Sequence, residues 1–180
     1  MTLIELLWTL GILAFVLSGI IAVFISGLHS EFDMNQRFEA QQEARLALQS
    51  MRTDVRTACS ASVTANTVVL GFCSNASTTW SSTPVSWSTW CIRGEGGTPA
   101  HYGLYRETTS DAANCATTST AGLREADWLT PSSAFGALTT TSGVRPELPV
   151  SISVDANPVK SGGVYTLSDQ IMLRNAPNNS

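Results

Sequence analysis

The sequence has few positive charges and few of the side chains that metal and redox sites need. Of its 180 residues, 10 are Lys or Arg and 14 are Asp or Glu, so the formal net charge is -4. That balance argues against a nucleic-acid-binding surface, which needs clustered Lys and Arg. The two histidines are His29 and His101, and no two cysteines are spaced Cys-x-x-Cys. Neither a zinc site nor a thioredoxin-like motif is expected.

Motifs for catalysis are missing as well. No serine lies in a Gly-x-Ser-x-Gly elbow, and the glycine-rich stretch 94–98 lacks the rest of a phosphate-binding loop. Asp111, Asp127, Asp155 and Asp169 fall in expected loops without the spacing of a calcium-binding run. We therefore expect no catalytic residue, no cofactor and no metal, and we expect a protein that is not an enzyme.

The cysteines, in contrast, suit a structural role. Four well-separated cysteines beside an apolar segment indicate two disulfides in an oxidising compartment. Cys59 and Cys73 are equidistant from Asn66, so a hairpin centred there would place them opposite each other. The favoured connectivity is therefore Cys59–Cys73 with Cys91–Cys115, and the two other connectivities stay open.

A long uncharged run lies near the N-terminus. No residue from Leu6 to Leu28 is charged, and about 20 apolar residues suffice to cross a bilayer. No basic stretch precedes the run and no small-residue cleavage site follows it, which argues against a signal peptide. Glu5, at its start, needs a partner in an apolar medium. The nearest cation is the α-amino group of Met1, reached within one chain or between neighbouring subunits, and the second arrangement would set an axial register.

The first seven residues, MTLIELL, followed by an apolar helix, resemble the mature N-terminus of a type IV pilin. The resemblance implies that a prepilin peptidase removes a leader before Met1 and methylates the new amine, and that Glu5 is needed for assembly. It further implies a homopolymer, or a polymer with other pilins, built by an assembly platform at the cytoplasmic (inner) membrane. A plain single-pass membrane anchor is the alternative.

Small residues punctuate the apolar run. Gly11, Gly19 and Gly27 would allow close approach of neighbouring helices. In many pilin filaments a short part of this helix melts. The proline usual near that point is absent here, so Ser18-Gly19 is the expected place if melting occurs. The alternative is that these glycines only face lipid or pack.

The following segment continues the helix and changes its character. Residues 29–58 contain no Pro or Gly, and an apolar stripe indicates packing on a globular domain. The intervening charged residues are expected on a solvated face. The stripe is Ala44, Leu48, Met51, Val55 and Ala58, and the charged residues are Glu39, Glu43, Arg45, Arg52 and Asp54.

From Cys59 onward the pattern indicates strands. Two short strands are expected around Asn66, and further strands in 91–109, 148–156 and 162–175, with a long loop over 111–143. A possible glycosylation sequon begins at Asn75. The segments 44–58, 103–107 and 171–175 resemble the J/W group of minor pilins and pseudopilins.

The expected fold is α+β, a long N-terminal helix packed on an antiparallel sheet. Residues 1–28 would be the membrane anchor and later the filament core, 29–58 the amphipathic continuation, and 59–180 a β-rich head. We expect a structural subunit of a type IV pilus-like filament, located first in the cytoplasmic membrane and then at the cell surface. Its work could be adhesion, motility, DNA uptake or secretion. The alternatives are a minor pilin or secretion pseudopilin, and a membrane-tethered binding module.

Overall fold

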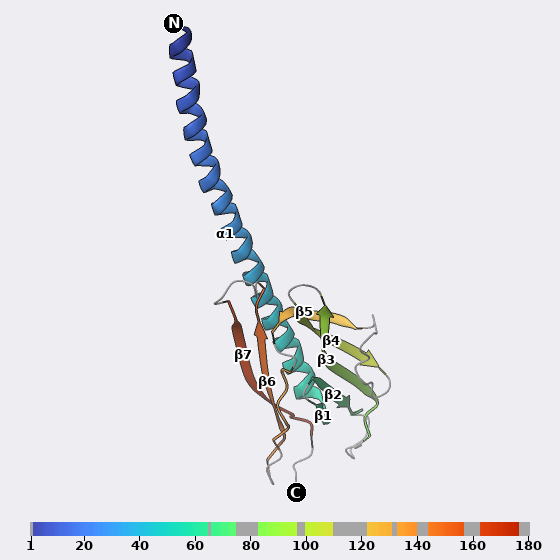
Figure 1. The fold of residues 1–180 in the computed structure, drawn as a ribbon. Coiled ribbons are helices and arrows are strands. Elements are labelled where there is room, and N and C mark those ends of the chain that lie inside the picture. Colours follow the sequence, from blue (N-terminus) through green and yellow to red (C-terminus); the bar gives the residue numbers. More distant parts are fainter. Residues whose placement is uncertain are drawn as a thin grey trace. The chain divides into compact units, whose positions relative to one another are not determined.

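The computed structural model describes residues 2–64, 66–74, 83–96, 100–109, 122–130, 133–139, 144–156 and 163–176. One long helix is followed by a seven-stranded antiparallel sheet, which confirms the expected α+β architecture (Figure 1). The chain divides into two compact units, Met1–Phe38 and Glu39–Ser180. The elements are α1 (Leu3–Thr57), β1 (Ser60–Thr64), β2 (Thr67–Phe72), β3 (Ser86–Gly96), β4 (His101–Thr109), β5 (Leu123–Leu129), β6 (Glu147–Val154) and β7 (Tyr165–Met172).

The sheet is a meander in which each strand pairs with the next along the chain. The pairing of β5 with β6 is the shortest in the sheet, since Leu129 and Val154 are its only registered partners among the described residues. The segment 133–139 continues the pairing along β6 instead, with bridges from Phe135 to Val150 and from Thr139 to Glu147. As a result, β6 has a neighbour on both sides along most of its length.

The core of the second unit forms between the last turns of α1 and the inner face of the sheet. The apolar stripe expected on the helix is buried throughout, because its side chains pack against Trp90 and the other inward residues of the strands. The helix ends at Thr57, whose carbonyl accepts a hydrogen bond from the side-chain amide of Asn175 at 2.9 Å. That bond satisfies one of the carbonyls that a helix C-terminus leaves without a partner.

The first hairpin carries a disulfide. Strands β1 and β2 pair from Ser60 with Gly71 to Thr64 with Thr67, so the turn falls at Asn66 as expected. Cys59 and Cys73 lie just outside the open end of the hairpin and are bonded, with their Cα atoms 5.9 Å apart. Cys91 is also disulfide-bonded, while its expected partner Cys115 and the sequon at Asn75 lie outside the described residues.

Strand β5 corrects the expectation of a long loop over 111–143. The pairing of β4 with β5 shifts register twice near Leu104, which disrupts the alternation that reveals a strand in sequence. Trp128 adds a backbone irregularity with a φ of 60°, uncommon for a bulky side chain. The expected loop positions of Asp127 and Asp169 are wrong too, since these residues lie in β5 and β7.

Candidate functional site

The N-terminal part of α1 has an apolar surface that its own unit leaves exposed among the described residues. Every residue from Thr2 to Phe32 is exposed, including large side chains such as Trp8, Phe15 and Phe24. By length and composition, α1 can cross a membrane. Water-soluble monomers rarely expose contiguous apolar patches larger than a few hundred Å². This surface therefore requires lipid or another protein around it.

Glu5 lies in the first turn of α1. Its backbone N–H donates to the carbonyl of Thr2 at 3.0 Å, and the N–H of Leu6 donates to the same oxygen at 3.4 Å. A carboxylate in the first helical turn interacts favourably with the positive end of the helix dipole. Met1 lies outside the described part of the chain, so its pairing with Glu5 stays a prediction.

The glycines of the apolar run pack against none of the described residues of the chain. Atoms added at the Cβ positions of Gly11, Gly19 and Gly27 would meet nothing within 4 Å. Ser18 and Gly19, the expected place if melting occurs, are helical in this isolated chain. Glycine costs a helix up to about 1 kcal/mol relative to alanine, and the fold of the single chain offers no compensation. The role of these glycines as contact sites for neighbouring helices stays a prediction.

Asp54 is the residue that the sequence interpretation misplaced, because its side chain is buried between helix and sheet instead of facing solvent. Its Oδ1 accepts a hydrogen bond from Nη2 of Arg106 at 2.8 Å. Its Oδ2 accepts from the Ser88 hydroxyl at 3.1 Å and from the Trp90 indole N–H at 3.0 Å. Glu125 lies 3.9 Å from the same arginine. This cluster links α1 to β3, β4 and β5 through one buried charge.

Further polar contacts of α1 reach the sheet, among them a hydrogen bond from the Asp127 N–H of β5 to the Glu43 carboxylate at 3.2 Å. Arg52 forms an ion pair with Asp169 of β7, Nε to Oδ2, at 2.5 Å. Arg45 donates to the Tyr165 hydroxyl at 2.9 Å. Charged residues in the last turns of α1 therefore bind the helix to the sheet, whereas the sequence predicted that they would face solvent.

A second polar cluster lies on β3–β5. The Tyr105 hydroxyl donates to the Glu95 carboxylate. The pKa of Tyr105 is raised above its usual value, mainly because the side chain is partly buried and secondly because of the hydrogen bond to Glu95 and its negative charge. Nearby, the His101 ring stacks on Trp128 with centroids 4.2 Å apart, and its Nε2 lies 3.4 Å from Oδ1 of Asp127. Among the described residues, no group of three or more His, Cys, Asp or Glu is arranged to hold a metal ion.

Comparisons with protein-family models, with characterised proteins and with solved structures find no match to this chain. The geometry itself is compatible with a pilin-like subunit: a long N-terminal helix, apolar and exposed in its first half, whose last turns pack on an antiparallel sheet. The same apolar segment indicates association with a membrane.

Proposed function

We propose that this chain is a structural subunit of a type IV pilus-like extracellular filament that polymerises through the N-terminal part of α1. The prepilin peptidase, the assembly platform and the other copies of the chain are the partners that this proposal entails. The role is structural rather than enzymatic.

The extent of the exposed apolar surface is the observation that carries the proposal. The uncharged run from Leu6 to Leu28 spans about 35 Å at 1.5 Å per residue, close to the roughly 30 Å of a bilayer's hydrocarbon. Exposed large apolar side chains continue beyond it, however, at Phe32, Met34 and Phe38, which are 60–69% exposed. From Leu3 to Phe38 the surface is about 53 Å long, more than lipid alone would cover.

Charged residues separate these outer apolar side chains. Glu31 is exposed, and Asp33 pairs with Arg37 one helical turn further on, at 3.5 Å. Hydrocarbon would exclude such charges, whereas a neighbouring protein helix can cover the apolar side chains and leave the charges at a polar boundary. This pattern favours a helix packed among other protein helices over a plain single-pass anchor.

Substituting Glu5→Val tests the proposal. If Glu5 pairs with an amine in the filament, its loss leaves a buried charge uncompensated, which costs about 3–5 kcal/mol. We expect the variant to remain in the membrane but to appear in sheared filaments at a level lower by about 100-fold or more. Glu31→Val is the matched control, because it makes the same chemical change at an exposed position of the same helix beyond the uncharged run.

The readout is the amount of each chain in filaments sheared from the cell surface, measured by quantitative mass spectrometry, with membrane fractions as the reference. Incorporation of Glu5→Val at the level of the control would contradict the assembly role. If the wild-type chain is the dominant component, it is a major subunit. If it is a trace component, it is a minor pilin, and if it is absent, a secretion pseudopilin or a tethered module becomes the better proposal.

A further inference from the structure

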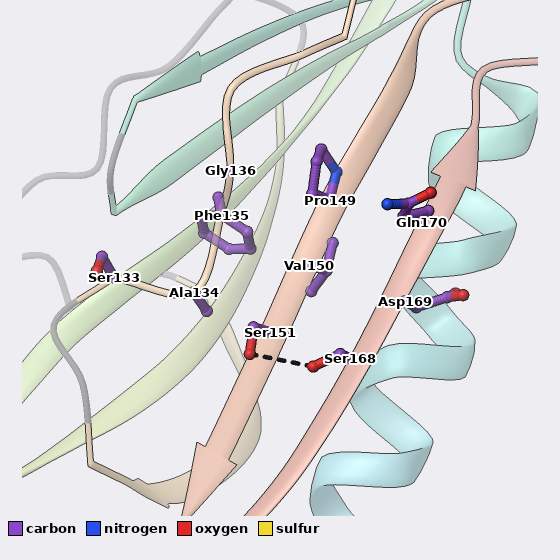
Figure 2. Close-up of a pocket in the computed structure, with 10 residues that line it drawn as sticks. All are labelled: Ser133, Ala134, Phe135, Gly136, Pro149, Val150, Ser151, Ser168, Asp169 and Gln170. Atoms are coloured by element: carbon purple, nitrogen blue, oxygen red, sulfur yellow. Dashed lines mark hydrogen bonds between the residues drawn. The ribbon is translucent and has the colours of Figure 1, made fainter.

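A groove lies on the head between the segment 133–136 and the strands β6 and β7 (Figure 2). Its volume is about 560 Å³, within the range of roughly 300–1,000 Å³ that is usual for small-molecule sites. We call it the β6–β7 groove. Its described lining residues are 133–136 from the segment before β6, 149–151 from β6 and 168–170 from β7.

The side chains exposed in the groove are neutral and polar. Ser133, Ser151 and Ser168 supply hydroxyls and Gln170 supplies an amide, and all four are exposed. Each of these groups both donates and accepts hydrogen bonds. The charged member of the described lining is Asp169, whose carboxylate is directed toward α1 (Figure 2) and pairs there with Arg52. The groove therefore offers hydrogen bonds without an uncompensated charge.

An apolar surface lies beside these polar groups. Pro149 is half-buried in the floor of the groove, and Gly136 lies directly against it. The Gly136 N–H donates to the Pro149 carbonyl at 2.8 Å. A Cβ at position 136 would lie 3.0 Å from the Cβ of Pro149, so glycine permits this close approach. The proline ring thus provides an apolar contact within reach of the hydroxyls.

The hydroxyl pair in the groove is held more loosely than its neighbour on the same two strands. The Oγ atoms of Ser151 and Ser168 are 3.3 Å apart (Figure 2), beyond the 2.5–3.0 Å of a good O–H···O bond. The next pair outward, Ser153 with Thr166, is 2.8 Å apart. A ligand hydroxyl can therefore bond to Ser151 and Ser168 while displacing only a weak interaction.

We propose that the β6–β7 groove binds a neutral carbohydrate. A sugar ring carries hydroxyls that match the serines and Gln170, and its C–H face can pack on Pro149. An anionic glycan would find no free cation among the described lining residues. This inference goes beyond the filament role and does not depend on it, because the groove belongs to the head alone.

The test uses the full chain in micelles of a polyoxyethylene detergent, since maltoside or glucoside detergents would compete for the groove. Maltotriose, cellotriose, mannotriose and chitotriose are titrated separately, with sialyllactose as the charged comparison, and binding is followed by saturation-transfer NMR. The double variant Ser151→Val/Ser168→Val removes the paired hydroxyls of the groove and leaves the Ser133 hydroxyl in place. Ser153→Val/Thr166→Val is the matched control, since it removes the adjacent hydroxyl pair outside the groove. Valine suits these strand positions, of which Ser151, Thr166 and Ser168 are exposed and Ser153 is half-buried.

We expect at least one neutral trisaccharide to bind. The groove variant should bind it about tenfold more weakly or worse, as expected for the loss of roughly two neutral hydrogen bonds. The control should stay within about twofold of wild type, and both variants should melt at similar temperatures. The proposal is overturned if no neutral sugar binds, if sialyllactose alone binds, if both variants lose affinity equally, or if the groove variant binds like wild type. None of these outcomes depends on whether the chain forms filaments.

Discussion

Replacing Asp54 with asparagine would measure how much the buried charge stabilises the contact between helix and sheet. The carboxylate accepts three hydrogen bonds, from Ser88, Trp90 and Arg106. Ser88 and Trp90 are fully buried, so their donors have no access to water if the acceptor is lost. The amide of asparagine keeps the shape, but it removes the charge and places an N–H₂ group where an acceptor is needed.

The expected loss in the free energy of unfolding depends on how exposed the donors to Asp54 are. Breaking a fully buried ion pair costs about 3–5 kcal/mol, but the Arg106 side chain is 34% exposed, so water can partly replace its partner. Leaving a buried donor such as the Trp90 N–H unsatisfied costs about 1–3 kcal/mol. Together these values give an expected loss of about 2–4 kcal/mol, which corresponds to a fall in melting temperature of about 6–12 °C for a unit of this size.

Asp169→Asn is the matched control for this prediction. It makes the same chemical change in a second ion pair between α1 and the sheet, but its partner Arg52 is 42% exposed, and exposed pairs contribute about 0–1 kcal/mol. Thermal unfolding of the full chain in detergent, followed by near-UV circular dichroism, would compare both variants with wild type. A loss for Asp54→Asn no larger than that for Asp169→Asn would refute the assignment of Asp54 as the central contact.

Two further predictions concern the head. Because the folded state holds the pKa of Tyr105 above its usual value of about 10, its stabilising effect is present below pH 10 and is lost as the pH rises through the folded pKa. Because Glu95 adds to the rise in the pKa that burial causes, Glu95→Gln should shift the ionisation of Tyr105 to lower pH in an absorbance titration at alkaline pH. An unchanged titration would contradict the contribution of Glu95. Labelling of the unreduced, denatured chain with a thiol reagent should give no adduct at Cys59, Cys73 or Cys91, since all three are disulfide-bonded. An adduct at any of them would contradict the structural role assigned to the cysteines.

Periodicity along the chain was sufficient to predict much of the fold. The apolar stripe that includes Ala44, Met51 and Val55 fixed both the helix and its buried face, because residues three and four apart share one side of a helix. The position of Asn66 between Cys59 and Cys73 was enough to predict the first hairpin and its disulfide. These features depend on residues that are close in sequence.

The features that the sequence did not reveal depend on distant residues. Asp54 meets Ser88, Trp90 and Arg106 only through the packing of α1 on the sheet, and separations of 34, 36 and 52 residues leave no pattern that identifies such partners. Strand β5 was missed for another reason, since its shifts in register disrupt the alternation of side chains. The β6–β7 groove likewise requires the pairing of the segment 133–139 with β6, which no local motif indicates.

The disulfide at the base of the first hairpin determines how the head would respond to mechanical force. Tension that overcomes the side-chain contacts of α1 with the sheet would reach β1 at Cys59 and pull it away from β2, starting at the pair of Ser60 and Gly71. The bond from Cys59 to Cys73 closes the hairpin at that end, so the hydrogen bonds of β1 cannot separate one after another under load. With the bond reduced, peeling β1 and β2 from the sheet would release about 45 Å of chain from the 14-residue separation between the two cysteines. In the oxidised protein the disulfide prevents this length of chain from extending. The force then acts on the pairing of β2 with β3 and on the contacts of Asp54.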